Sequence, residues 1–215
     1  MTQSVQHCPS GNCRTEPQTA GADPMARLAR DPIVRAVLQQ QCLVAGEFAP
    51  DFGGEVAGGA AIDLERLLES GPVVLHFDHG RWCGICRSEL KALAQAWQQS
   101  QPKNASLVVV RMVLQGTEPL EVDTMPYRLL PDTGGHIASL YGLLIHVPAS
   151  IAVQMAPICE LPDVSGSGDS GYTVPATIVI NRNGIADLCQ IDPDHSLGRS
   201  VATTLACLRA LLSKD

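Results

Sequence analysis

The sequence predicts an α/β fold with a central mixed β-sheet flanked by helices. Two nearly continuous apolar runs, 72–77 (PVVLHF) and 107–114 (LVVVRMVL), have the pattern of strands that are buried on both faces of a sheet. Between them, residues 83–99 carry apolar side chains at helical spacing on one face. A strand, a helix and a strand in this order form a crossover that joins two parallel strands.

The end of the chain adds an antiparallel pair and a closing helix. Residues 176–180 (ATIVI) and 185–191 (IADLCQI) flank the sequence NRNG, whose Asn-Gly pair is a strong hairpin signal. Residues 200–212 then form an amphipathic helix. The sheet is therefore predicted to combine parallel and antiparallel strands.

The N-terminal region divides into a tail and a helical extension that precede the main domain, 44–215. Residues 1–23 are polar and contain few large apolar side chains, so we expect a disordered tail. In the extension, 24–43, Asp31 and Pro32 are typical of a helix start, and apolar residues recur at helical spacing to Gln41. This helix is expected to pack on the main domain or on a partner subunit.

The remaining segments are expected to be less regular, and their glycines and prolines set the boundaries. They are a loop at 46–59, a short helix at 63–69 that ends at Gly71, a proline-punctuated stretch at 116–131, a helix near 136–143, and an insertion at 149–171 that closes with a mobile Gly-Ser loop.

Composition excludes some functions. The 15 basic and 22 acidic residues give a net charge of -7, and no basic cluster is present, which argues against nucleic-acid binding. The N-terminus lacks the pattern of a signal peptide, and no stretch has the length of a membrane span. We therefore expect a cytoplasmic protein without a membrane partner. There the eight cysteines should be mostly reduced, so a close pair is catalytic or metal-binding.

The closest pair of cysteines is Cys83-Gly84-Ile85-Cys86, at the start of the helix predicted for 83–99. A thiol at a helix N-terminus lies beside free N–H groups and the positive end of the helix dipole, which lower its pKa. The two-residue spacing places the second thiol one turn further, within reach of a disulfide. Cys83 and Cys86 are thus predicted to be a catalytic redox dithiol.

The same spacing also occurs in zinc knuckles, for which Cys8 and Cys13 would supply the other ligands. A knuckle places its cysteines on a loop, whereas Cys83 and Cys86 lie between a buried strand and a long helix. This context favours the redox dithiol, and we expect neither a metal nor another cofactor.

Six segments between about residues 44 and 195 resemble, in order, the alkyl hydroperoxide reductase and thiol-specific antioxidant family, in its peroxiredoxin-like branch that carries CxxC. The resemblance implies a thioredoxin-like fold with an N-terminal extension and an insertion. The matching segments are GEFAPDF (46–52), GPVVLHF (71–77), GRWCGICRSELKAL (80–93), GGHIASLYGL (134–143), VPATIVINRNG (174–184) and DPDH (192–195).

The resemblance assigns roles in two ways. In the peroxiredoxin pattern Cys86 is the peroxidatic cysteine, His79 and Cys83 replace the proline and the threonine, and Pro175 stands where the family has a catalytic arginine. In the thioredoxin pattern, Trp82 and Cys83 begin WCxxC, Cys83 attacks first, and Pro175 belongs to a cis-proline loop that faces the dithiol.

Three further residues are candidates by position. His76 is either the base for the second cysteine or an ordinary core histidine, and His79 and Arg81 either stabilise a thiolate by charge or are solvated loop residues. Cys8 and Cys13 could exchange disulfides with the dithiol. The other cysteines, in apolar contexts, are expected to be ordinary buried residues: Cys42, Cys159, Cys189 and Cys207.

The sequence therefore predicts an enzyme, a thiol-based oxidoreductase with two possible chemistries. In thiol–disulfide exchange, ranked first, Cys83 attacks a protein or small-molecule disulfide; in peroxide reduction, Cys86 attacks a hydroperoxide and condenses with Cys83. A thioredoxin- or glutathione-type reductant would restore the dithiol, and a homodimer is possible. The alternative is a redox sensor or a zinc-binding interaction module without turnover.

Overall fold

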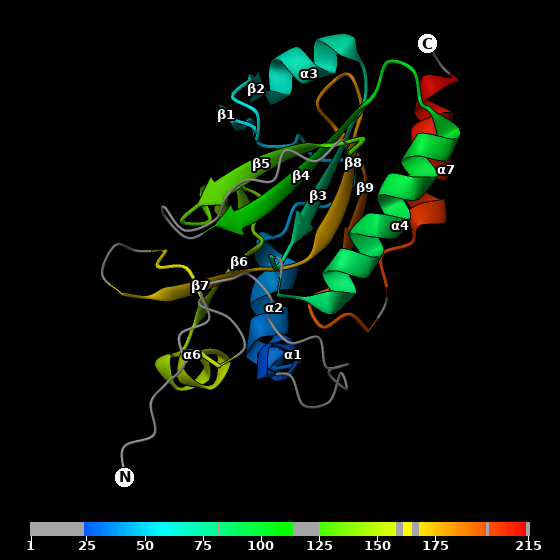
Figure 1. Ribbon diagram of the computed structural model, residues 1–215. Coiled ribbons are helices and arrows are strands. Elements are labelled where there is room, and N and C mark those ends of the chain that lie inside the picture. The colour runs from blue at the N-terminus through cyan, green and yellow to red at the C-terminus, as the bar shows by residue number, and fades with distance from the viewer. Residues whose placement is uncertain are drawn as a thin grey trace.

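A computed structural model describes residues 24–80, 82–113, 125–157, 161–164, 168–196 and 198–213. Its centre is a five-stranded sheet with the strand order β5-β4-β3-β8-β9 (Figure 1). The strands are β3 (Val73–Asp78), β4 (Ser106–Val113), β5 (Arg128–Thr133), β8 (Ala176–Ile180) and β9 (Ala186–Ile191).

The sheet is mixed, as the sequence predicts. Strands β3, β4 and β5 run parallel, whereas β8 pairs antiparallel with both β3 and β9. The hairpin between β8 and β9 turns at the Asn-Gly pair, where Gly184 has a φ of 78°. This arrangement is a thioredoxin-like α/β fold.

Strand β5 begins within the stretch 116–131, which was expected to be less regular, and extends to Thr133. Pro131 is in the middle of the strand and pairs with Arg111 of β4. Proline has no N–H group for a sheet ladder, but β5 is the edge strand, so its outer side needs no partner. In the sequence, Pro131 therefore argues against a strand, although the edge position of β5 permits one.

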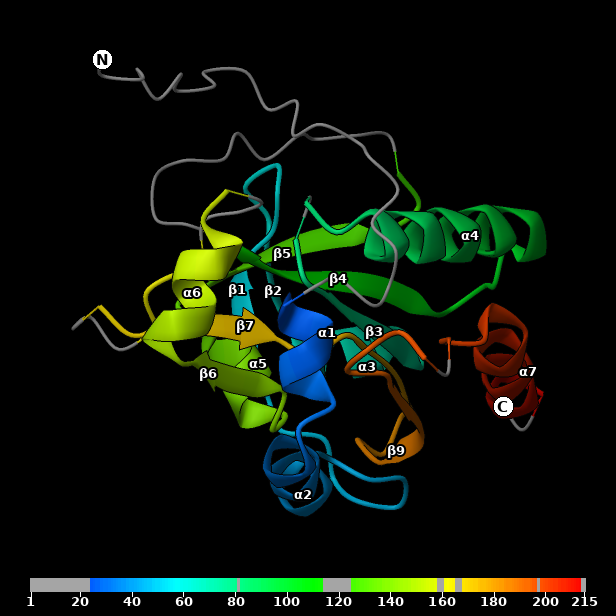
Figure 2. The ribbon, with the colours of Figure 1, turned by 90° about the horizontal axis from the view of Figure 1, so that it is seen from below.

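Helices cover both faces of the sheet, and Figure 2 shows α2 (Pro32–Gln41) and α4 (Gly84–Ser100) on opposite sides. Helices α4 and α7 (Val201–Leu212) pack on one face of the sheet, over β3, β4 and β8. On this face, Trp97 and Leu208 belong to the same apolar cluster as Val74 and Val179. The other face forms a larger core that includes Leu38, from α2.

Helix α4 begins where the sequence predicts. Its N-cap is Cys83, whose sulfur accepts a hydrogen bond from the Cys86 N–H group at 3.3 Å. Its apolar face, which includes Leu90, Leu93 and Trp97, is buried as expected. The redox dithiol is therefore held at the end of a packed helix.

The smaller elements add detail to the predicted loops. Two short strands form a hairpin in and after the glycine-rich segment 46–59, and another pair of strands borders the insertion. The helix expected from residue 63 begins one residue later, with Asp63 as its N-cap and Gly71 as its C-cap. These elements are β1 (Gly53–Glu55), β2 (Ala61–Asp63), α3 (Leu64–Ser70), α5 (His136–Leu140), β6 (Leu144–Val147), α6 (Ala149–Met155) and β7 (Ser170–Thr173).

The helical extension consists of α1 (Pro24–Ala29) and α2. Asp31 caps α2 as predicted, accepting hydrogen bonds from the N–H groups of Ile33 and Val34. At the other end of α2, the Gln41 amide donates to the Gly142 carbonyl at 3.0 Å. The extension therefore packs on the main domain; the tail 1–23 lies outside the described residues.

Within the described part of the chain, no helix combines the length and the apolar character needed to cross a membrane.

Gly142 provides a test of how the extension is attached. It has a φ of 68°, and an added Cβ would lie 2.1 Å from the Gln41 carbonyl oxygen. We expect Gly142→Ala to lower the free energy of unfolding by at least about 2 kcal/mol, because left-handed strain and a backbone clash add. Urea unfolding measures the change.

The matched control is Gly134→Ala. Gly134 has a φ of 70°, but an added Cβ meets no atom within 4 Å. Its cost should be the conformational strain alone, about 1–2 kcal/mol. Equal losses in the two variants would contradict the close approach of α2.

Candidate functional site

The two cysteines of the dithiol lie at the first turn of α4 and are almost closed to solvent. Cys83 is 6% exposed and Cys86 is 0% exposed. Both are free thiols. A reagent therefore reaches Cys83 before it reaches Cys86.

Two imidazoles converge on the sulfurs. His79 follows β3, and its Nδ1 atom lies 3.5 Å from the Cys86 sulfur. His195 comes from the loop between β9 and α7, and its Nε2 atom lies 3.6 Å from the Cys83 sulfur and 3.8 Å from the Cys86 sulfur. The two nitrogens are 3.3 Å apart. The prediction placed His79 near the site but assigned no role to His195.

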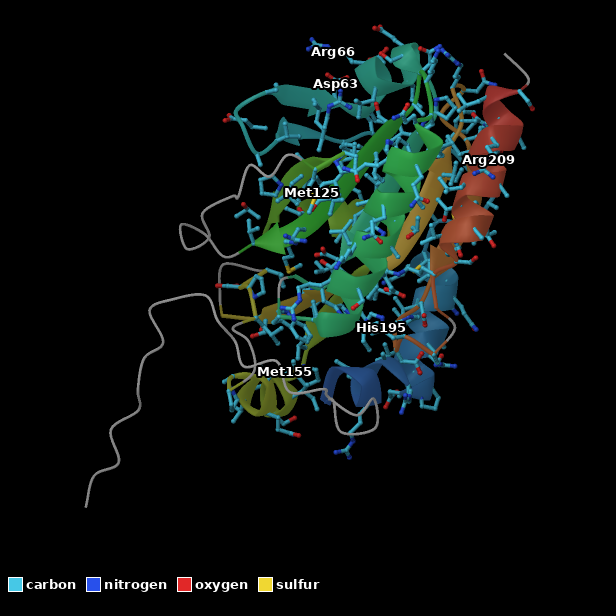
Figure 3. All side chains as sticks on the ribbon, turned by 45° about the vertical axis from the view of Figure 1, so that its right-hand side comes forward. Asp63, Arg66, Met125, Met155, His195 and Arg209 are labelled. Carbon is cyan, nitrogen blue, oxygen red and sulfur yellow. The ribbon has the colours of Figure 1, made fainter. Side chains whose placement is uncertain are left out.

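The loop that carries His195 has a fixed conformation. His195 has a φ of 54°, in the left-handed region. Next to it, Asp194 binds Arg30 at 2.9 Å and Arg35 at 3.3 Å, both from the helical extension. Figure 3 shows His195 beside the first turn of α4. The extension thus holds the loop that brings His195 to the dithiol.

A buried guanidinium completes the site. Arg199 lies just before α7, and one of its nitrogens, Nη2, is 4.0 Å from the Cys86 sulfur. Its Nη1 atom donates to the Phe77 carbonyl at 2.7 Å and to the Ala176 carbonyl at 3.4 Å. It also forms an ion pair with Glu89 on α4.

Arg199 corrects one expectation. The sequence comparison placed Pro175 where the family has its catalytic arginine, and it did not identify Arg199 as a candidate. The tertiary structure supplies one from the other end of the domain, 113 residues after Cys86. The signal available in the sequence was an arginine at the start of the last helix, which by itself is ordinary.

The surroundings shift the pKa values of the two thiols in opposite directions. The pKa of Cys83 is lowered by a hydrogen bond from Cys86 and, against the effect of burial, by His195 and His79. Burial, followed by the adjacent charge of Cys83, raises the pKa of Cys86, although Arg199 opposes the shift. The thiolate of the pair is therefore on Cys83.

The two histidines also differ. Burial lowers the pKa of His79, and the nearby Cys83 only partly offsets it. Burial acts in the same direction on His195, but contacts with Cys83 and Glu89 outweigh it, so the pKa of His195 is raised. His195 is the imidazole that remains protonated to higher pH.

His76 is buried in the core. Its side chain is 1% exposed, and Nδ1 lies 3.0 Å from the hydroxyl of Thr177 on the neighbouring strand β8. Burial, with the charges of Arg199 and Arg111, holds its pKa well below the usual range. These contacts favour the interpretation as a core histidine, bonded to a hydroxyl rather than to a backbone carbonyl.

Pro175 does not form the expected cis-proline loop. No cis peptide bond occurs among the described residues, and Pro175 is buried. Its carbonyl accepts a hydrogen bond from Asp192, and the Val174 N–H group donates to Leu143. These backbone groups are therefore hydrogen-bonded within the fold.

Trp82 stacks on His79 with ring centroids 5.4 Å apart and an interplanar angle of 11°. Tyr172, from β7, packs against His79 with a centroid separation of 4.6 Å. The strand at the end of the insertion thus contributes to the site through an aromatic contact. Arg81 lies outside the described residues.

Among the residues that the structure describes, the other cysteines do not join the dithiol. Cys42, Cys189 and Cys207 are half-buried rather than fully buried, and burial raises the pKa of Cys42 and of Cys189 to about 11. Cys8, Cys13 and Cys159 lie outside the described residues.

Comparisons with known proteins agree with this fold. The AhpC/TSA family model matches residues 45–187, which include both cysteines. A search of curated protein sequences finds no match.

Three solved structures share the fold. A peroxidoxin, BcpB, from Mycobacterium tuberculosis is 23% identical, with a TM-score of 0.52, over 78% of this chain and 97% of that one. The reduced 2-Cys peroxiredoxin of Plasmodium vivax is 19% identical, with a TM-score of 0.56, over 80% and 98%. Thioredoxin peroxidase I of Plasmodium yoelii is 20% identical, with a TM-score of 0.56, over 79% and 91%.

The family match covers most of the chain and includes the strand, the helix and the dithiol described above. The chain belongs to the AhpC/TSA family.

Proposed function

We propose that the protein reduces small hydroperoxides through its dithiol, with Cys83 as the first nucleophile and Cys86 as the resolving thiol. The observation that supports this most is the convergence of two sulfurs, two imidazoles and the Arg199 guanidinium in a buried site. A lone thiolate lacks donors for the departing oxygen, whereas this dithiol has His195 beside Cys83 and Arg199 beside Cys86.

In the first step, the Cys83 thiolate attacks the nearer oxygen of a hydroperoxide. A sulfur–oxygen bond forms, the O–O bond breaks, and the products are a sulfenic acid on Cys83 and an alkoxide. Protonated His195, whose Nε2 atom lies 3.6 Å from the Cys83 sulfur, gives its proton to the alkoxide, which leaves as an alcohol.

In the second step, Cys86 resolves the sulfenic acid. Neutral His195 accepts the proton of the Cys86 thiol, whose sulfur is 3.8 Å from Nε2. Sulfur attacks sulfur, the disulfide forms, and the hydroxyl group leaves with that proton as water. An external dithiol, or two monothiols such as glutathione, then reduces the disulfide and becomes oxidised in turn.

Thiol–disulfide exchange is the second candidate. The Cys83 thiolate caps α4, and Cys86 lies one turn further, the order in which a mixed disulfide would form and resolve. The near-complete burial of both sulfurs favours a small-molecule disulfide over one in a folded protein. Because buried sulfurs favour a small substrate, peroxide reduction is the first candidate, whereas the sequence alone favoured thiol–disulfide exchange.

The order of attack is testable with single serine variants. In Cys86→Ser, we expect peroxide to leave a stable sulfenic acid on Cys83. In Cys83→Ser, we expect the rate of sulfenic acid formation to fall by about tenfold or more, because the remaining thiol is fully buried. Rapid mixing, dimedone trapping and peptide mass spectrometry measure both.

Cys189→Ser is the control for loss of an unrelated thiol, since Cys189 has a raised pKa and lies on β9. A fast-forming sulfenic acid on Cys86 in Cys83→Ser would reverse the order. A wild-type rate equal to that of a free thiol would exclude a dedicated peroxidase.

The pH dependence of alkylation tests the charge on Cys83. Because the pKa of Cys83 is lowered, iodoacetamide should label it at an almost constant rate down to a pH where ordinary cysteines have become unreactive. His195→Asn removes a group that lowers this pKa, so the fall in rate should begin at a higher pH. The experiment uses reduced, chelator-treated protein. If the pH profile of alkylation is the same in His195→Asn as in wild type, the interaction of His195 with the Cys83 thiolate is contradicted.

Arg199 is predicted to accelerate oxidation. Lysine keeps the charge but cannot reach both carbonyls and Glu89 from one planar group. We expect Arg199→Lys to slow peroxide oxidation of the dithiol by about 10–100-fold, less than the roughly 100–1,000-fold typical for complete loss of a positioned donor, because the charge remains. Stopped-flow Trp fluorescence gives the rate. Arg209→Lys, an exposed position on α7, should leave it unchanged.

A further inference from the structure

The side chains around the dithiol present a complete set of metal ligands. His79, Cys83, Cys86 and His195 each offer one ligand atom, and these four atoms all lie within 4.8 Å of one another. Two thiolates and two imidazoles are a donor set of tetrahedral structural Zn²⁺ sites.

The separations match those of a tetrahedron around zinc. Bonds of about 2.3 Å to sulfur and about 2.0–2.1 Å to nitrogen imply edges of about 3.6 Å between sulfur and nitrogen and about 3.3 Å between two nitrogens. Three of the four sulfur–nitrogen distances are 3.5, 3.6 and 3.8 Å, the fourth pair lies within 4.8 Å, and the two nitrogens lie 3.3 Å apart.

Hydrogen bonds alone do not account for this convergence. The Nε2 atom of His195 has three close polar neighbours, which are the two sulfurs and Nδ1 of His79. An imidazole nitrogen carries either one proton or one lone pair, so it satisfies one of these contacts at a time. A cation at the centre would bind all four atoms through one lone pair each.

The surroundings orient the imidazoles as a metal site requires. The loop that carries His195 is held by the ion pairs of Asp194 with the helical extension. Glu89 lies 3.8 Å from Nδ1 of His195, too far for a hydrogen bond, so its carboxylate acts on this ring through its charge. His79 is held by ring contacts with Trp82 and Tyr172. Both rings are thus positioned before a metal arrives.

The charges also balance with a divalent cation. Cys86 is fully buried, and two thiolates in this site would carry two negative charges. Zn²⁺ neutralises them, while the neighbouring ion pair of Arg199 and Glu89 has no net charge. The cation would therefore remove the cost of burying the second thiolate.

The geometry points to a Zn²⁺ site formed by His79, Cys83, Cys86 and His195 in the reduced protein. The four ligands close the coordination sphere, so the metal is held without an open position for substrate. Zinc and the Cys83–Cys86 disulfide would need the same sulfurs, so they exclude one another. The site does not depend on the proposed peroxide chemistry, because it requires only two reduced thiols.

Binding is tested on the reduced, metal-free, full-length chain. We expect one Zn²⁺ per chain in competition with a chromophoric chelator, and a higher melting temperature with zinc. Co²⁺ should give the visible spectrum of a tetrahedral site with two sulfur ligands. Protein first oxidised with diamide, which takes two electrons from the dithiol and becomes a hydrazine, should bind neither metal at this site.

Ligand variants assign the site. His79→Phe keeps a ring for stacking, and His195→Asn keeps a residue that tolerates the left-handed conformation. Each variant should lower the affinity for zinc by at least about 100-fold. This is more than the 10–100-fold loss typical for mutation of a residue that only supports a ligand. The matched controls, His146→Ala and Cys189→Ser, remove an exposed histidine and an unrelated thiol and should bind as wild type.

Two results would overturn the proposal. Absence of stoichiometric zinc in the wild-type chain is one. The other is binding that survives in both histidine variants but is lost in the double variant Cys8→Ser/Cys13→Ser, which would place the metal on four cysteines. The Co²⁺ spectrum of wild type separates two from four sulfur ligands even if a variant fails to fold. Peroxide reactivity plays no part in these readouts, so failure of the proposed function would leave them unchanged.

Discussion

The contacts of Arg199 hold the site together. Its guanidinium donates to carbonyls at the end of β3 and the start of β8, pairs with Glu89 on α4, and faces the Cys86 sulfur. An unpaired buried charge is very costly, and the charge of Arg199 is paired with Glu89 and hydrogen-bonded to two carbonyls, although its Nε atom has no hydrogen-bond partner. The same contacts therefore fix α4 against the sheet and place a positive charge beside the dithiol.

A second constraint comes from the helical extension. Arg30 and Arg35 bind Asp194, and α2 approaches the domain closely at Gly142. His195 follows Asp194, so this contact fixes the residue that lies between the two sulfurs. The extension is consequently part of the architecture of the site, although it contributes no reacting atom. The acidity of Cys83, the proton on His195 and the proposed metal ligation all depend on the same loop.

Much of the fold follows from local patterns. The buried strands, the start of α4 at Cys83, the Asn-Gly turn and the capped helices depend on residues close in sequence, and the structure agrees with each. Strand β5 was not predicted, because Pro131 is compatible with a strand only at a sheet edge and that position depends on the strand order. The prediction of a cis-proline loop was wrong, because a Val-Pro pair before a strand determines neither the isomer nor the burial of the bond between them.

The sequence by itself determined the α/β fold and the cysteine pair at a helix N-terminus, because local spacing along strands and helices encodes both, and the resemblance of six segments indicated the family. Only the tertiary structure decided what surrounds the sulfurs. His195 and Arg199 lie more than 100 residues from the dithiol, and the family-like segment DPDH (192–195) by itself assigned His195 no role. Their positions depend on the antiparallel return of β8 and β9 and on ion pairs with the extension. The environment of a buried thiol is set by whichever side chains the packed chain brings within a few ångströms, and sequence spacing does not record those distances.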